Sequence, residues 1–315
     1  MTLTVRRLLD AGRAALDLGL LQGEAHLDRV VREPAMNRPG LALAGFLRYF
    51  AHRRIQVIGL AELTYLKGLP VEERGARLKA FFAAGIPCVV LSRGIRPLPE
   101  MPALAEEYGV PLLRTHQITG RFVQTAAVLI EELIAPRTRY QGTMVDINGI
   151  GTMIEGPPGV GKSETALSLI VRGYSLVADD LAELRRVSSG EILGTALDAT
   201  RFHMEIRGLG IIHVPSLYGV TSVRREKRLD MIVRLERAMS AADEERTGLD
   251  AQTKDVLGVA VPFFRIAVVA GRDISNVVEA AALNFRLRQL GHDAAKELDQ
   301  RLMQQLIAER PRTSD

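Results

Sequence analysis

The segment that most constrains the fold is Gly156-Pro-Pro-Gly-Val-Gly-Lys162-Ser163, which matches the phosphate-loop pattern G-x-x-x-x-G-K-S at every fixed position. In such a loop, backbone N–H groups turn toward a polyphosphate, the lysine reaches its β- and γ-phosphates, and the serine hydroxyl can ligate Mg²⁺. The flanks read as a strand over 152–155 and a helix over 163–171, whose dipole favours a bound anion. The chain is therefore predicted to bind a nucleotide or another polyphosphate through Gly156, Pro157, Pro158, Gly159, Val160, Gly161, Lys162 and Ser163.

Length and composition predict a soluble protein of two domains. A chain of 315 residues can bury two separate cores. Its apolar runs are too short to cross a bilayer, and its first residues lack the apolar core of a signal peptide. The single cysteine, Cys88, excludes an intramolecular disulfide. We therefore expect a cytoplasmic location, no membrane attachment, and a buried thiol at Cys88 in place of a nucleophile.

The charge pattern argues against nucleic acid as a partner. The net charge is +4, but the basic residues are scattered and only 5% of residues are aromatic, with no tryptophan. The densest basic cluster, residues 224–228, is interrupted by Glu226. This pattern is typical of a solvated face or a docking patch for an acidic partner, and not of a surface that stacks bases.

Residues 1–135 are predicted to form a small parallel α/β domain. Strand-like and helix-like segments alternate in this region, which is typical of a parallel sheet. No phosphate loop, metal cluster or acid pair occurs here, so the domain is interpreted as an accessory domain with a structural or assembly role. The expected strands are 55–60, 86–92 and 110–114, and the expected helices are 61–68, 72–84, 102–108 and 122–134.

Residues 136–315 are predicted to form a phosphate-loop kinase domain with a mixed sheet. Residues 135–139 read as a linker, with Pro136 ending the preceding helix. Segments 142–147 and 151–155 flank Asn148-Gly149, a hairpin signal, so an antiparallel pair leads into the loop. Further on, residues 294–307 have leucines four apart and predict a helix with one apolar stripe.

Two adjacent acids, Asp179 and Asp180, end a predicted strand that begins at Ser175. This strand is expected to return beside the loop strand, which would bring both carboxylates to the γ-phosphate and its metal. Neighbouring strand residues point to opposite faces, so only one acid can aim at the reacting phosphoryl group. Such a carboxylate can deprotonate an attacking hydroxyl, which favours a kinase. The alternative interpretation is a polar strand end.

A second dense segment covers residues 204–213. Glu205 and Arg207 are predicted to share one side of an extended segment, and the glycines at 208 and 210 to permit close backbone approach. The same pattern also fits a salt-bridged strand or a glycine turn. The chain's histidines at 116, 203 and 213 lack metal-ligand spacing and are interpreted as surface or packing residues.

Together these runs resemble the HPr kinase/phosphorylase family of bacteria, which acts on a serine of the phosphocarrier protein HPr. The combination of a short loop-to-Asp-Asp spacing with Glu-Ile-Arg-Gly-Leu-Gly is specific to it. The resemblance is close over 140–290 and looser over the N-terminal domain. The matching runs are 159–167, 177–180, 205–212, 246–248, 270–272 and 278–286.

The resemblance implies Mg·ATP-dependent phosphorylation of HPr and the reverse phosphorolysis with inorganic phosphate, in a cytoplasmic homo-oligomer, typically a hexamer. It implies that Asp180 takes the serine proton and returns it in reverse, and that the lysine and loop hold the phosphates. Ser163 and Glu205 resemble the Mg²⁺ ligands. Further functional positions implied by the resemblance are Asp179, Arg207, Gly208, Gly210, the catalytic arginine Arg246, and Arg272 at the end of a dephosphorylation segment, 267–272.

One departure concerns the residue before the hairpin, where the family carries histidine and this chain carries Gln141. An imidazolium offers phosphate a charge-assisted hydrogen bond, whereas an amide offers a neutral one. We therefore expect a changed balance of the two activities at this candidate catalytic position, at the expense of phosphorolysis. Two other functions stay open on the residues alone: a kinase for another acceptor, such as a small-molecule alcohol, and a nucleotide-gated sensor.

Overall fold

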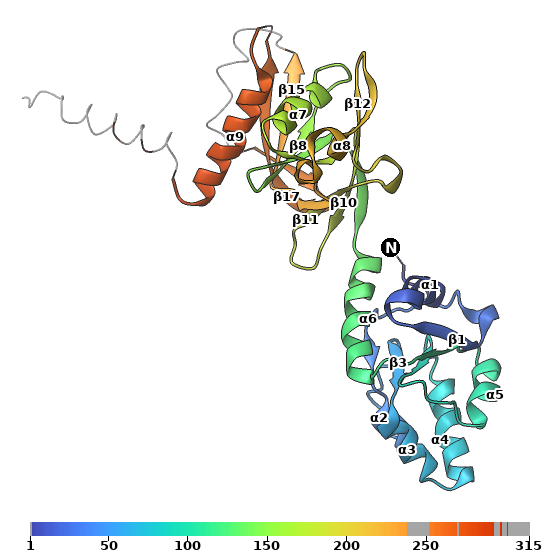
Figure 1. The fold of residues 1–315 in the computed structure, drawn as a ribbon. Helices are drawn as coiled ribbons and strands as arrows, with labels where there is room; N and C mark the ends of the chain where they lie inside the picture. The colour runs from blue at the N-terminus through green and yellow to red at the C-terminus, as the bar shows by residue number, and fades with distance from the viewer. Residues whose placement is uncertain (1, 238–251, 270, 293–296, 298–300, 302–315) are drawn as a thin grey trace, which may run out of the picture. The chain divides into compact units, whose positions relative to one another are not determined.

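The computed structural model describes residues 2–237, 252–269, 271–292, 297 and 301 (Figure 1). The chain forms two compact units, residues 1–135 and 136–315. Arg246 lies outside the described residues. So does the predicted helix 294–307, except for residues 297 and 301, both helical.

A five-stranded sheet forms the centre of the first unit, in the order β1-β5-β4-β3-β2. Strands β2 to β5 are parallel neighbours, and β1 joins antiparallel to β5. This arrangement confirms the small parallel α/β fold, whose three predicted strands are β3, β4 and β5. The edge strands β1 and β2 were not predicted. The strands are β1 Leu18–Gln22, β2 Met36–Asn37, β3 Ile55–Ile58, β4 Val89–Leu91 and β5 Leu112–Thr115.

Helices cover both faces of this sheet, so every residue of its central strands β3, β4 and β5 is buried except the half-buried Arg114. Residues of α1 and α6 form one core with Val57 and Val90, and residues of α2 to α5 form another with Ile58 and Leu91. Burial raises the pKa of the Cys88 thiol to about 12, as expected of a packing residue. The helices are α1 Val5–Ala15, the 3₁₀ turn Glu24–His26, α2 Gly40–Leu43, α3 Leu60–Lys67, α4 Val71–Ala83, α5 Glu100–Glu107 and α6 Thr119–Ile134.

The main sheet of the second unit has the order β16-β17-β15-β8-β7-β9. It is mixed, as predicted: β8, β15 and β17 are parallel, and β7 is antiparallel to both β8 and β9. The Asn148-Gly149 hairpin is confirmed, with positive φ angles of 54° and 92°. The strands are β7 Thr143–Ile147, β8 Ile150–Glu155, β9 Ser175–Ala178, β15 Met231–Arg237, β16 Gln252–Val256 and β17 Val259–Val268.

One prediction about this sheet is wrong. Strand β9 does not lie beside the loop strand β8, because the hairpin partner β7 occupies that position. Both β8 and β9 run antiparallel to β7, so their carboxyl ends still lie at the same edge of the sheet. The acids after β9 therefore reach the loop from one strand farther away than predicted.

A second sheet, in the order β14-β11-β10-β6, and a separate β12–β13 hairpin complete this unit. The predicted linker is wrong after Ala135, because Arg137–Gln141 forms strand β6 and pairs with β10. An ion pair of 2.7 Å between Arg137 and Glu183 adds to this pairing. The remaining elements are α7 Lys162–Val171, β10 Leu181–Arg186, β11 Ile192–Ala196, the 3₁₀ turn Asp198–Thr200, β12 His203–Ile206, β13 Gly210–His213, α8 Val214–Tyr218, the 3₁₀ turn Val220–Ser222, β14 Glu226–Arg228 and α9 Ile274–Gln289.

The alternation of side chains along β7 and β8 divides the second unit into layers. Val145 and Ile154 face a core with α7 and α9, whereas Met144 and Met153 face the second sheet. The hairpin leading into the phosphate loop is thus buried on both faces, which fixes the loop's starting point.

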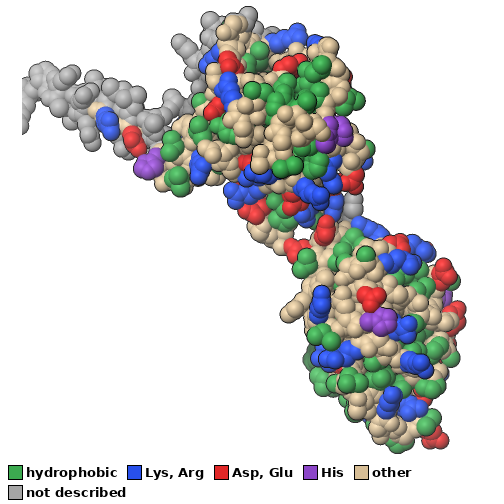
Figure 2. Space-filling model, in the orientation of Figure 1, with side chains coloured by type: hydrophobic (Ala, Val, Ile, Leu, Met, Phe, Trp, Pro, Cys, Tyr) green, Lys and Arg blue, Asp and Glu red, His purple; other side chains and the backbone are tan. Residues whose placement is uncertain are grey.

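Acidic and basic side chains interleave on the visible surface of each unit (Figure 2). The basic run 224–228 follows this pattern. Lys227 lies 3.2 Å from Asp146, and Arg228 lies 2.6 Å from Asp230. Because acids neutralise much of this run, it fits a solvated face better than a docking patch.

Candidate active site

The phosphate loop connects the end of β8 to the start of α7, and its glycines hold backbone conformations that other residues rarely adopt. The φ angles are 151° at Gly156, 73° at Gly159 and 102° at Gly161. A Cβ on Gly156 would also lie 2.5 Å from the carbonyl oxygen of Leu235 on β15. Gly156 is therefore required both by its conformation and by a close approach of the neighbouring strand.

Lys162 begins α7 and lies over the loop. Its Nζ is 3.2 Å from the carbonyl oxygen of Gly156 and 3.4 Å from that of Pro157. The loop residues Pro157, Pro158 and Gly159 are exposed. The ammonium is thus held beside an open loop at the amino end of a helix, where an anion is favoured.

Asp179 is the point at which four segments of the site meet. Its Oδ1 accepts hydrogen bonds from Thr143 Oγ1 at 2.8 Å and from Ser163 Oγ at 3.1 Å. Its Oδ2 accepts from the backbone N–H of Glu205 at 3.2 Å. Only 8% of Asp179 is exposed. Thr143, on β7, was missed by the sequence analysis because its role depends on the β7–β9 pairing.

The electrostatic state of Asp179 favours a cation nearby. Burial raises the pKa of its carboxyl, the hydrogen bonds from Thr143, Ser163 and Glu205 lower it, and the charge of Asp180 raises it. A buried carboxylate with a raised pKa is stabilised in its charged form by a neighbouring positive ion. Among the described residues, no group of three or more histidine, cysteine, aspartate or glutamate side chains is placed to hold a metal ion by itself. The site fits Mg²⁺, which keeps several waters and takes further oxygens from phosphates.

Asp180 differs from its neighbour in being exposed, and its φ of 59° is left-handed. Aspartate tolerates this conformation better than most residues. Its carbonyl oxygen accepts a hydrogen bond from Gly142 N at 2.9 Å. Gln141 lies opposite Leu181 in the β6–β10 pair. The structure therefore brings Asp180, in the bend just before β10, close to Gln141 at the end of β6, and both residues are exposed.

The β12–β13 hairpin corrects one prediction. Arg207 lies in the turn and not on the strand with Glu205. Gly208 and Gly210 have φ angles of 85° and 91°, and no atom lies within 4 Å of a Cβ built at either position. These glycines therefore serve the turn conformation, and the space beside them is open among the described residues. The turn brings Arg207 to the loop, since its Nη2 lies 3.4 Å from a Cβ built on Gly159.

Glu155, the last residue of β8, anchors a polar group that the sequence analysis missed. Its carboxylate is 2.6 Å from Lys254 Nζ and 3.6 Å from Arg234 Nη1, and it accepts a hydrogen bond from the Tyr140 hydroxyl. Burial and this carboxylate raise the pKa of Tyr140. The only signal in the sequence is an acid directly before the loop. The network fixes the end of β8 where Gly156 begins.

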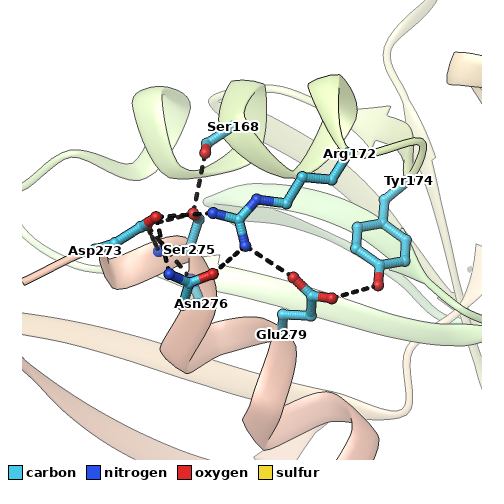
Figure 3. A network of polar contacts seen from close by, with 7 residues as sticks. All are labelled: Ser168, Arg172, Tyr174, Asp273, Ser275, Asn276 and Glu279. Atoms are coloured by element: carbon cyan, nitrogen blue, oxygen red, sulfur yellow. Dashed lines mark hydrogen bonds and ion pairs between the residues drawn. The ribbon is translucent and has the colours of Figure 1, made fainter.

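Arg272 lies in the turn between β17 and α9, beside a network that joins α7 to α9 (Figure 3). Arg172 at the end of α7 lies 2.8 Å from Asp273 and 2.9 Å from Glu279. Asp273 also caps α9, accepting from Ser275 N at 3.0 Å. The start of α9, and with it the position of Arg272, is therefore tied to α7.

Comparisons with known proteins agree over the whole chain. The family described as HPr Serine kinase N terminus matches residues 3–129, and HPr Serine kinase C-terminal domain matches residues 132–302. HPr kinase/phosphorylase from Leptospira biflexa is 42% identical, over 91% of this chain and 90% of that protein. The protein of the same name from Caldicellulosiruptor bescii is 40% identical, over 89% and 90%.

A solved structure, the Hpr(Ser) kinase/phosphatase from Coxiella burnetii, is 27% identical and covers 51% of this chain and 98% of its own, with a TM-score of 0.45. No helix among the described residues is long and apolar enough to cross a membrane. Fold and site define a phosphate-loop phosphotransferase. The chain belongs to the HPr serine kinase family, a kinase family and hence a user of ATP.

Proposed function

We propose that this chain transfers a phosphoryl group from ATP to a serine of HPr, and that it catalyses the reverse phosphorolysis with inorganic phosphate. The observation that carries this proposal is the exposed carboxylate of Asp180 at the same sheet edge as the phosphate loop. A phosphate loop alone binds nucleotide, whereas a base beside it can activate an alcohol. Curated relatives named HPr kinase/phosphorylase, matched over nine-tenths of the chain, support HPr as the acceptor.

In the forward direction, the loop and Lys162 orient the polyphosphate, and Asp180 accepts the proton of the serine hydroxyl. The serine oxygen forms a bond to the γ-phosphorus while the bond to ADP breaks. In reverse, an oxygen of inorganic phosphate attacks the phosphoserine phosphorus, Asp180 returns the proton to the serine oxygen, and pyrophosphate forms. Ser163 and Glu205, with Asp179 between them, would hold Mg²⁺, which supplies charge neutralisation on the phosphates.

The remaining roles extend the same proposal. The turn residues Arg207, Gly208 and Gly210 bring a guanidinium to the loop, which supports a contact with bound phosphate. Arg272 is assigned to phosphorolysis and Arg246 to stabilising the transferred group. We assign residues 1–135 to an accessory domain and 136–315 to the catalytic domain of a cytoplasmic homo-oligomer, a hexamer by family resemblance.

The decisive experiment incubates the protein with purified HPr and Mg·ATP and maps phosphoserine by mass spectrometry. Phosphorylated HPr is then returned with inorganic phosphate, and pyrophosphate is measured. The variant Asp180→Asn is assayed in both directions beside the wild type. Phosphoserine that forms equally well with this variant would remove Asp180 as the base. Nucleotide binding without transfer to HPr would favour a different acceptor or a sensor.

A further inference from the structure

Two histidines that lack metal-ligand spacing in the sequence face each other across the β12–β13 hairpin. His203 and His213 are paired residues in its register, and their ring centroids are 5.0 Å apart with an interplanar angle of 46°. Both side chains are exposed, whereas the alternate residues Met204 and Ile212 are buried. The hairpin is therefore anchored on one face and presents both imidazoles on the other.

Each ring has its Nδ1 engaged by an oxygen atom. His203 Nδ1 lies 2.9 Å from the carbonyl oxygen of Arg201, which can only accept a hydrogen bond. This nitrogen therefore carries the proton, and the Nε2 of neutral His203 carries the lone pair. His213 Nδ1 lies 2.6 Å from Ser216 Oγ. Metal-binding histidines are held in this way, with one nitrogen fixed by an oxygen and the other directed to the ion.

We propose that His203 and His213 bind one divalent first-row transition ion, Zn²⁺ or Cu²⁺, through their Nε2 atoms. With metal–nitrogen bonds of about 2.0–2.1 Å, two imidazoles on neighbouring coordination positions have centroids about 5 Å apart, which is the observed spacing. Imidazole suits these ions, whereas Mg²⁺ prefers oxygen. Two side chains supply two ligands, and water completes the coordination.

The pair is distinct from the candidate Mg²⁺ residues, although Glu205 lies on the same face two residues from His203. Glu205 is directly opposite Ile211, so it is a diagonal neighbour of His213. The backbone N–H of Glu205 bonds to Asp179, which places the proposed ion on a hairpin that is joined to the phosphate site. The proposal does not depend on the identity of the phosphoryl acceptor.

Isothermal titration with Zn²⁺, in excess Mg²⁺ to occupy oxygen sites, tests the pair on the full chain. The variants are His203→Gln and His213→Gln, and the matched control is His116→Gln, an exposed histidine paired with Asp17. Wild type and control should bind one Zn²⁺ at this site. Removing a residue that only holds a metal ligand in place typically lowers metal affinity by about 10- to 100-fold. Each variant at His203 or His213 removes a proposed ligand itself, so its Zn²⁺ affinity should fall at least about tenfold.

Electron paramagnetic resonance with Cu²⁺ provides a second measurement, whose expected change a folding defect in a variant would not reproduce. The wild-type spectrum should show coupling to two imidazole nitrogens, and each single variant should show one. Unchanged Zn²⁺ affinity in either variant would overturn the proposal, as would a wild-type spectrum without two nitrogens. Circular dichroism should be unchanged in both variants because the two rings are exposed.

Discussion

The two ends of α7 differ. At its amino end, Lys162 lies over two carbonyl oxygens of the glycine loop. At its carboxyl end, Arg172 contacts Asp273, which caps α9, and Asn276 and Glu279 within α9. The first end is open, and its cation has partners that a phosphate can replace. The second end is held by charged side chains. This difference shows how one helix can present an adaptable ligand site while its axis stays fixed, since ligand-binding loops come from the less stable parts of a fold.

The largest effect should come from Asp180→Asn, at the open end. Asparagine also tolerates the left-handed φ of this position, so the variant changes charge without adding strain. We expect phosphorylation of HPr to slow by about 10²- to 10⁴-fold, because a general base is lost. Mg·ATP binding, measured by titration calorimetry, should stay close to wild type. Normal turnover combined with weak ATP binding would reverse this assignment.

Lys162→Ala should reduce kcat/KM by about 10²- to 10³-fold, the range seen when one charge-stabilising donor is removed. Unlike the Asp180 variant, it should also weaken nucleotide binding, because the ammonium contacts phosphate in both ground and transition states. Initial rates and nucleotide affinity measured on one preparation separate the two variants. Wild-type activity in Lys162→Ala would exclude the phosphate loop from the mechanism.

Gln141→His should raise phosphorolysis relative to phosphorylation by about tenfold, since charge assistance adds roughly 1–2 kcal/mol to a hydrogen bond with phosphate. An added histidine titrates near neutrality, so the gain should be larger at about pH 6 than at about pH 8. The ratio of the two rates is measured across that range. A ratio equal to wild type throughout would contradict the prediction, and a gain independent of pH would indicate geometry.

Arg172→Ala, at the held end, should have the smallest effect on catalysis and lower the unfolding temperature by a few degrees. Hydrogen bonds from Ser275 lower the pKa of Asp273, and those from Tyr174 and Arg172 lower the pKa of Glu279. Carboxylates with lowered pKa values stabilise the fold above their unfolded pKa, near 4, and lose this contribution as pH falls.

The stability difference between Arg172→Ala and wild type should therefore shrink on acidification below about pH 4. Thermal unfolding followed by circular dichroism at several pH values measures it, with Arg172→Lys as the variant that keeps the charge. A difference that stays constant with pH would show that the contribution of Arg172 is packing alone.

The parts of the site that the sequence predicted are those fixed by local chemistry. The phosphate loop and the Asn148-Gly149 turn depend on glycine conformations, which a short run of adjacent residues is enough to predict. The position of β9 beside β7 was predicted wrongly because strand neighbours depend on the whole sheet. Strand β6 was read as a linker because only its partner β10, more than forty residues away, supplies its hydrogen bonds.

The polar networks could not be predicted from the sequence either, because their members also come from distant parts of the chain. Glu155 and Lys254 meet only after β8 and β16 take their places in one sheet, and Arg172 meets Asp273 across two helices. Their sequence separations carry no periodic signal. Arg207 shows the opposite case, because its turn is local, yet the same residues fit a strand equally well.

The β7–β8 hairpin has a consequence for how the site assembles during folding. Hairpin, loop, α7 and β9 form one continuous stretch from Thr143 to Ala178, so contacts between them close short chain loops, which costs little entropy. By contrast, the paired residues of β8 and β15 are about eighty positions apart in the chain. The carbonyl oxygen of Leu235 on β15 also approaches Gly156 closely. We expect the phosphate loop to form early with its local partners and to reach its final shape only when β15 docks.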